Sequence, residues 1–198
     1  MSTWKEMSDE ELALLYANGN NKAFDVLLSR VQDKLFTYIF CLVKNEDVAN
    51  DLFQDTFIKA IVRLREGKYR NNGKFLFWLT RIAHNVIIDQ FRDIKSSHIV
   101  DAPKNNDLGN LHEDNLLESY REKELENEQV LKDIQTLMNA LPAVQREVVY
   151  MRYYQDMSFK EIAKATGVSI NTSLGRMRYA LINLRKLSRE HGIELQLY

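Results

Sequence analysis

Apolar residues recur at intervals of three and four along most of the chain, and the pattern is clearest between residues 23 and 43. The apolar positions there are Phe24, Leu27, Leu28, Val31, Leu35, Tyr38, Ile39 and Leu42. This spacing places the side chains on one face of an α-helix. Together with a capping box formed by Ser8 and Glu11, the pattern predicts four helices that form one bundle, over residues 9–18, 23–43, 47–65 and 73–93.

The periodic pattern stops between residues 96 and 117, where a polar, acidic segment contains Pro103, Gly109 and several Asn. This composition is typical of a linker. Helical periodicity resumes near Glu118 and reaches Leu141, and Pro142 fits the first turn of another helix. We therefore predict an all-α fold with two small helical domains, residues 1–95 and 118–198, joined by a flexible acidic linker over residues 96–117.

The composition supports this fold and limits the function. Only 7 Gly and 2 Pro occur in 198 residues, too few for the frequent turns of an all-β protein. The single Cys41 excludes an internal disulfide and a cysteine-based zinc cluster, so we expect a reducing compartment. No signal peptide pattern and no apolar run of ~20 residues is present. We expect a cytoplasmic protein with no membrane insertion, no metal and no cofactor.

The net charge of −1 hides a strong segregation of charge along the chain. Residues 59–95 hold 9 basic and 3 acidic side chains, and residues 142–191 hold 9 and 4. Residues 1–58 hold 5 basic and 10 acidic side chains, and residues 99–132 hold 4 and 9. The two basic segments suit contact with a polyanion, whereas the acidic segments would repel phosphate and must face water or a basic partner.

The C-terminal basic segment has the layout of a helix-turn-helix. Ser158 and Glu161 form a second capping box, Gly167 permits a tight turn, and Ser169 caps the next helix. In this motif the second helix enters the major groove of DNA. We predict that its apolar stripe is Ile170, Leu174, Met177, Leu181 and Leu184. A plain helical hairpin with solvated basic residues is the alternative, and whether Arg176 and Arg178 meet guanine edges or phosphates stays open.

The predicted helix after residue 73 has two different faces. Its apolar face contains Leu79, Ile82, Ala83 and Val86, with Phe75 and Trp78 at the edges. The opposite side carries aromatic, basic and amide groups, namely Phe77, Arg81, His84, Asn85, Ile88 and Arg92. A face that meets only water does not need this mixture, so we expect it to contact a partner.

Three segments carry a resemblance to a known family. They are "DLFQDTFIKA" (Asp51–Ala60), "FLFWLTRIAHNVIIDQFR" (Phe75–Arg92) and "LPAVQREVVYMRYYQDMSFKEIAKATGVSINTSLGRMRYAL" (Leu141–Leu181). Their order and spacing resemble bacterial RNA polymerase sigma factors of the sigma-70 family, in the extracytoplasmic-function (ECF) class with only two DNA-binding domains. The resemblance spans about Ser8 to Leu187. It implies sigma region 2 in residues 1–95 and sigma region 4 in residues 118–198.

The resemblance also implies the function and the partners. A sigma factor of this class binds core RNA polymerase and directs transcription initiation at promoter DNA, and an anti-sigma factor is a further partner that the family admits. In the family, the helix that corresponds to residues 47–65 docks on the polymerase clamp helices. The candidate polymerase contacts are therefore Asp51, Leu52, Gln54 and Asp55.

In the family, region 2 holds the melted −10 non-template strand, and a loop before the helix receives a flipped-out base. The candidate −10 contacts are Lys68, Tyr69, Arg70, Asn71, Asn72, Lys74, Phe77, Trp78, Arg81, Asn85, Ile88, Asp89 and Arg92. Among these, Trp78 fits the core better than the strand path because it lies at the edge of the apolar face. For the −35 element the candidates are Lys160, Ser169, Asn171, Thr172, Ser173, Arg176, Arg178 and Tyr179.

Two other classes of function compete with this interpretation. An enzyme is disfavoured because four scattered His, one Cys and no Gly-rich phosphate loop give no convergent site. A free-standing helix-turn-helix regulator explains the second basic segment but leaves the mixed face of the first domain without a role. The reading helix departs from the commoner family pattern at Leu174 and Gly175, where many relatives carry basic or hydroxyl groups, so the −35 preference stays open.

Overall fold

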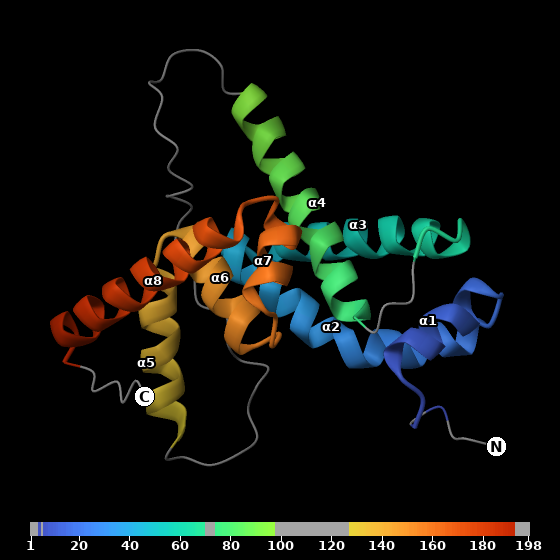
Figure 1. Ribbon diagram of the computed structural model, residues 1–198, viewed down its shortest axis with the longest axis horizontal. Helices are drawn as coiled ribbons and strands as arrows, with labels where there is room; N and C mark the ends of the chain where they lie inside the picture. The colour runs from blue at the N-terminus through green and yellow to red at the C-terminus, as the bar shows by residue number, and fades with distance from the viewer. Residues whose placement is uncertain (1–3, 5, 70–73, 98–126, 193–198) are drawn as a thin grey trace. The chain divides into compact units, whose positions relative to one another are not determined.

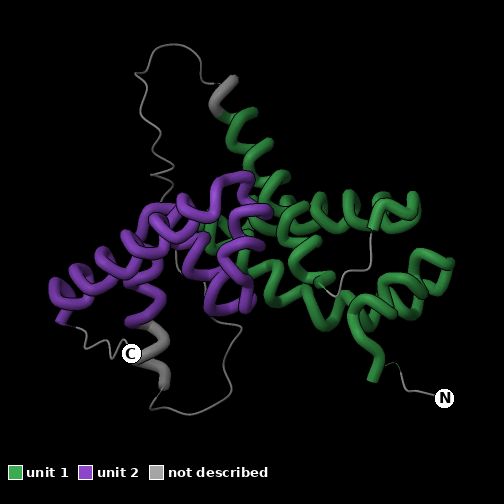
Figure 2. The backbone as a smooth tube through the Cα atoms, viewed as in Figure 1, with its two compact units in different colours: residues 1–104 green, residues 105–198 purple. Residues whose placement is uncertain are grey.

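The computed structural model describes residues 4, 6–69, 74–97 and 127–192. Within these residues the chain forms eight α-helices and no strand (Figure 1), which confirms the predicted all-α class. The chain divides into two compact units, residues 1–104 and 105–198, which are coloured separately in Figure 2. Most of the predicted linker, and residues 118–126 of the helix predicted to run from residue 118 to 141, fall outside the described residues.

Unit 1 is a bundle of four helices, α1 (Asp9–Ala17), α2 (Asn21–Val43), α3 (Glu46–Arg65) and α4 (Phe75–Ser97). Helix α2 packs against the other three, and α3 packs against α1 and α4. Both ends of α2 follow local signals. Its N-cap Asn20 accepts a hydrogen bond from the backbone N of Ala23, and Lys44 ends it in the left-handed region at φ 55°. The predicted bounds are right to within a few residues.

The core of unit 1 is built from the periodic apolar positions. Leu27, Leu35, Ile39, Leu79 and Ile82 are all buried. Full burial of each such side chain contributes about 1.5–3 kcal/mol. The predicted apolar faces of the long helices therefore form the core of the bundle.

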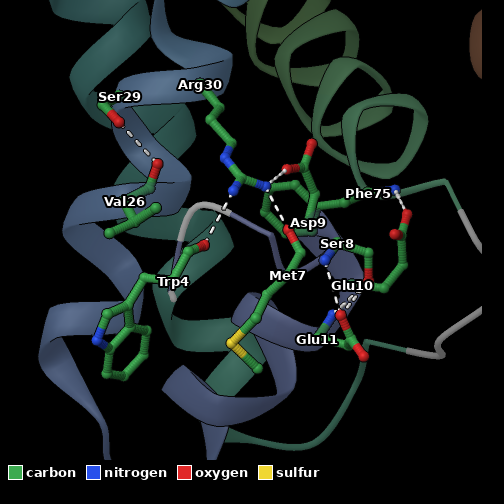
Figure 3. A network of polar contacts seen from close by, with 10 residues as sticks. All are labelled: Trp4, Met7, Ser8, Asp9, Glu10, Glu11, Val26, Ser29, Arg30 and Phe75. Atoms are coloured by element: carbon green, nitrogen blue, oxygen red, sulfur yellow. Dashed lines mark hydrogen bonds and ion pairs between the residues drawn. The ribbon is translucent and has the colours of Figure 1, made fainter. Parts of the chain in front are cut away.

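Arg30 attaches the segment before α1 to the bundle (Figure 3). Its Nη1 donates to the carbonyl oxygen of Met7 at 2.7 Å and to Asp9 Oδ1 at 3.0 Å, and its Nη2 donates to the carbonyl oxygen of Trp4 at 3.0 Å. The planar guanidinium suits this arrangement because its donors point in fixed, diverging directions. Arg30 thereby fixes the start of α1 against α2.

Unit 2 contains α5 (Asn127–Ala140), α6 (Ala143–Tyr153), α7 (Phe159–Thr166) and α8 (Ile170–Glu190). Helix α8 packs against the other three. The predicted capping box at Ser158 is present, Gly167 makes the turn after α7 at φ 69°, and Ser169 caps α8. Pro142 is the residue before α6 rather than part of its first turn. Helices α7 and α8 form the predicted helix-turn-helix.

Candidate polymerase and nucleic-acid interfaces

A stripe of exposed residues runs along α3. It consists of Asp51, Asp55, Ile58 and Val62, spaced by four, three and four residues, so their side chains are neighbours on the helix surface. Ile58 is 59% exposed and Val62 is 48% exposed. Gln54 is exposed beside them. Carboxylates next to exposed aliphatic groups suit a partner that offers basic residues around an apolar patch.

Leu52 is not part of this stripe, so its prediction as an exposed contact is wrong. It is 3% exposed and belongs to a buried series with a spacing of three and four. Helix α3 packs against α1, α2 and α4, so its buried face is wider than a single stripe. The buried series is Ala49, Leu52, Thr56, Ala60 and Leu64.

A second exposed stripe lies on α4. Arg81, Asn85 and Asp89 are exposed and follow one another at intervals of four residues. Arg92 is also exposed, and its Nη1 lies 3.6 Å from Asp89 Oδ1. Ile88 is half-buried at the side of the stripe. The cationic and amide groups of this surface suit a sugar-phosphate backbone and base edges, whereas Asp89 is an acidic group beside Arg92.

Phe77 is buried, so it does not line this surface as predicted. The reason is that α4 packs against α1, α2 and α3, and every residue from Phe75 to Thr80 is buried or half-buried. The buried face therefore extends past Leu79 and Ile82 to include Phe77 and Thr80. With three neighbouring helices, the buried face of α4 is wide enough to include Phe77, although the sequence placed Phe77 on the polar side.

Tyr69, Phe75 and Trp78 form an aromatic cluster at the start of α4. The ring centroids of Tyr69 lie 5.6 Å from Phe75 and 5.0 Å from Trp78, both in edge-on contacts. Tyr69 is buried, which corrects its predicted role as an exposed loop contact, while Trp78 is half-buried. Such aromatic pairs add ~0.5–1.5 kcal/mol beyond their buried area. The cluster joins Tyr69 to the first turn of α4.

The Tyr69 hydroxyl is buried and has no hydrogen-bond partner in the described part of the chain. Burial, followed by the negative charges of Glu10 and Asp9, raises the pKa of Tyr69 to about 12. Both causes disfavour the phenolate, so Tyr69 is a neutral phenol at physiological pH.

Helix α1 also holds the start of α4. Glu10 Oε1 accepts a hydrogen bond at 3.0 Å from the backbone N of Phe75, the first residue of α4 (Figure 3). A carboxylate at this position satisfies a free helix N–H and interacts favourably with the helix dipole. Lys68 and Lys74 are exposed on either side of the loop. The predicted loop contacts that lie outside the described residues are Arg70, Asn71 and Asn72.

Most of the predicted −35 contacts lie at the surface of the helix-turn-helix. The exposed ones are Lys160, Ser169, Asn171, Thr172, Arg178 and Tyr179, and Arg176 is half-buried. Ser169 Oγ accepts a hydrogen bond from the backbone N of Thr172 at 3.0 Å. It also lies 2.8 Å from Thr172 Oγ1. Ser169 is thus an N-cap that also holds the Thr172 hydroxyl.

The inward face of α8 differs from the predicted one. The buried positions are Ser173, Met177, Ala180, Leu184 and Ser188. Ser173 is therefore not available to DNA, which corrects its prediction, and its hydroxyl has no hydrogen-bond partner among the described residues. Ile170 and Leu174, predicted in the apolar stripe, are 46% and 44% exposed. Helix α8 is packed by α5, α6 and α7, so its neighbours and not its apolar residues decide which face is buried.

Four exposed residues of these surfaces were not among the candidate contacts. They are Ile58 and Val62 on α3 and Ile170 and Leu174 on α8. The position of Ile58 could have been found, because it lies three residues after Asp55 and four before Val62. The apolar spacing of Ile170 and Leu174 predicted that they are buried, so nothing in the sequence indicated their exposure.

Neither a metal-binding cluster nor a membrane-spanning helix is present among the described residues. No group of three or more His, Cys, Asp or Glu in that part of the chain could hold a metal ion. None of the helices formed by those residues has both the length and the apolar character needed to cross a bilayer.

Comparison with known proteins gives matches in both units. The family model described as Sigma-70 region 2 matches residues 27–97, and the one described as Sigma-70, region 4 matches residues 131–176. The ECF RNA polymerase sigma factor SigE of Mycolicibacterium smegmatis is 27% identical over 98% of this chain and 74% of its own length. The ECF RNA polymerase sigma factor SigW of Bacillus subtilis is 28% identical over 87% of this chain and 92% of its own length.

A solved structure supports the fold. The sigma factor RpoE, in complex with the anti-sigma factor NepR from Bartonella quintana, matches with a TM-score of 0.60 and 24% identity. The match covers 85% of this chain and 98% of that one. The two family models match the bundle of unit 1 and the helix-turn-helix of unit 2, in the order that the sequence predicts. The chain belongs to the sigma-70 family of RNA polymerase sigma factors, in the extracytoplasmic-function class.

Proposed function

We propose that this sigma factor binds core RNA polymerase through the exposed stripe of α3, holds the melted −10 strand on α4, and reads the −35 element with α8. The observation that carries the proposal is the separation of surfaces. The acidic and aliphatic stripe, the polar stripe of α4 and the basic helix-turn-helix occupy different helices of one chain. A free-standing regulator needs only the last of these surfaces.

The polymerase contact is proposed for Asp51, Gln54, Asp55, Ile58 and Val62. Opposite charges across an interface speed encounter and set orientation more than they add affinity. Affinity comes largely from burying apolar surface at the centre of the contact. Ile58 and Val62 supply that part, which the acidic residues alone do not, and they take the place that the sequence had assigned to Leu52.

The −10 contact relies more on polar groups than predicted from the sequence. With Phe77 and Tyr69 buried, Trp78 is the half-exposed aromatic ring at this surface. The proposed path of the strand runs past Lys74 and along Arg81, Asn85 and Arg92. Basic groups follow the phosphates and Asn85 offers an amide to a base edge. Tyr69, Phe75 and Glu10 then act by holding the loop and the start of α4 in place.

The −35 contact is proposed for the first turns of α8 and for Lys160 on α7. Exposed Asn171, Thr172 and Arg178 lie where a reading helix meets base edges. Residues 142–191 carry 9 basic and 4 acidic side chains, which favours the phosphate backbone.

An anti-sigma factor is proposed as a competing partner for unit 1. A related sigma factor was solved in complex with an anti-sigma factor. A protein that covers Ile58 and Val62 would exclude polymerase from the same stripe. Competition between the two partners therefore follows from a single shared surface.

Transcription reconstituted from purified components tests the proposed function. We expect the chain alone to bind duplex promoter DNA weakly and to direct initiation at defined start sites once core polymerase is added. Mapping transcript starts after overproduction of the chain supplies the promoter. Tight, specific binding to an operator without polymerase, combined with no initiation in the reconstituted assay, would instead identify a free-standing regulator.

A further inference from the structure

Gly175 lies inside α8, but packing within the protein does not require it. The helix runs through it from Ile170 to Glu190, and a Cβ at this position would meet no atom within 4 Å. Unlike Gly167, which makes the preceding turn at φ 69°, Gly175 does not lie in the left-handed region. Glycine is among the least favourable residues in a helix interior, so alanine would strengthen α8 here. A use for this glycine must therefore come from outside the chain.

Gly175 lies on the outward face of α8. The buried residues Ser173 and Met177 are two positions before and after it, which is roughly 160° away around the helix. Its surface neighbours at three and four residues are Asn171, Thr172, Arg178 and Tyr179, all exposed. Bare backbone is thus framed by amide, hydroxyl and basic groups, which are the groups that contact DNA bases and phosphates.

Two exposed aliphatic side chains precede Gly175 on α8. Ile170 and Leu174 lie one turn apart near the start of α8 and are 46% and 44% exposed. In the major groove the apolar group among the base edges is the 5-methyl of thymine, which takes contacts from apolar side chains. Aliphatic residues on the first turns of a reading helix are therefore suited to contact the methyl group of thymine.

We propose that α8 approaches duplex DNA at Gly175 more closely than a side chain would allow, and that Leu174 and Ile170 contact thymine methyl groups in the −35 element. The proposal rests on the proposed function of unit 2 and specifies how that unit selects its sequence. Duplex DNA is the occupant because the surface belongs to the reading helix of a helix-turn-helix in a segment of net charge +5, from 9 basic and 4 acidic residues.

The first test is Gly175→Ala, assayed with the full chain and core polymerase on a promoter found by transcript mapping. We expect hydrogen exchange of the α8 amides to slow, by up to about fivefold, because alanine stabilises the helix. Open-complex formation should fall about tenfold or more because the added methyl group separates helix and duplex. Stability and function change in opposite directions, so a folding defect cannot explain the loss.

The second test replaces each −35 thymine singly by deoxyuridine, which lacks only the 5-methyl group. The wild-type holoenzyme should lose about fourfold in promoter affinity at one or two positions, as expected for one methyl group. Leu174→Ala should abolish that sensitivity at one of them. Ile182→Ala is the matched control, because Ile182 is also 46% exposed on α8 but lies two turns further along. It should respond to deoxyuridine as wild type does.

Distinct outcomes separate the failure of this proposal from the failure of the proposed function. Unchanged promoter use by Gly175→Ala, or an unchanged deoxyuridine response of Leu174→Ala, overturns the close approach and the methyl contact respectively. If Gly175→Ala binds core polymerase more weakly but keeps its −35 preference, the surface at Gly175 contacts a protein and not DNA, which also overturns the proposal. If the wild-type chain directs no initiation at all, the proposed function itself has failed.

Discussion

Replacing Tyr69 by Phe tests whether the buried hydroxyl lacks a partner. The ring contacts with Phe75 and Trp78, at 5.6 Å and 5.0 Å, are kept by phenylalanine. A buried, unpaired hydroxyl costs about 1–3 kcal/mol. Because the phenol is a neutral group, the lower end of this range applies, and we expect Tyr69→Phe to raise the free energy of unfolding of unit 1 by about 1 kcal/mol at pH 7.

The same substitution changes the response to alkali. The pKa of Tyr69 is 10.0 when unperturbed and about 12 in the folded protein. Between these values the unfolded state releases the phenolic proton and the folded state keeps it, so stability falls as pH rises through this window. The loss amounts to about 1.4 kcal/mol at pH 11 and about 2.7 kcal/mol above pH 12. Tyr69→Phe removes this loss, whereas other Tyr and Lys titrate equally in both proteins.

Urea unfolding of the full chain at pH 7, 9 and 11, followed by tryptophan fluorescence, measures both effects. The chain has 2 Trp, Trp4 and Trp78, and both belong to unit 1, so the signal reports that unit. The difference between variant and wild type should grow by about 1.4 kcal/mol from pH 9 to pH 11. A variant that is less stable at pH 7, or a difference that does not grow with pH, would refute the assignment of Tyr69 as a buried, unpaired phenol.

Three further variants address the other surfaces. Asp55→Lys should weaken the ability of the chain to compete with the wild type for core polymerase about tenfold, mainly through slower association. Asp33 on α2 is also an exposed carboxylate, and Asp33→Lys should leave this competition unchanged. Equal effects of the two variants would show that the α3 stripe is not part of the contact. Asn85→Ala should impair initiation on duplex promoters more than on templates already melted at −10. Gln90 is also an exposed amide, so Gln90→Ala is the control. Equal loss on both templates would indicate that Asn85 does not contact the melted −10 strand. Arg30→Met removes the hydrogen bonds to Met7, Asp9 and Trp4 and should lower the urea stability of unit 1 by about 1–2 kcal/mol, a moderate value because the pair with Asp9 is partly exposed. Arg30→Lys should restore only part of that loss, and full restoration would show that charge alone matters.

The helices and the order of the two units were predictable from the sequence because their signals are local. Apolar spacing follows the helix period, and capping boxes such as Ser8–Glu11 and Ser158–Glu161 act within one turn. The first two family segments lie within α3 and α4, and the third spans α6, α7 and the first half of α8. Arg81, Asn85 and Arg178 were correctly placed at the surface because charged and amide side chains are rarely buried without partners.

Outside the clear apolar faces, only the tertiary structure decided which uncharged residues were buried. The width of a helix's buried face depends on how many helices pack against it, and the spacing of apolar residues within one helix does not reveal that number. Neighbouring helices buried Leu52, Phe77 and Ser173, against prediction, and left Ile58 and Leu174 in contact with water. The sequence determined where the polar and charged surfaces of this sigma factor lie along the chain, and packing determined which side chains are exposed on them.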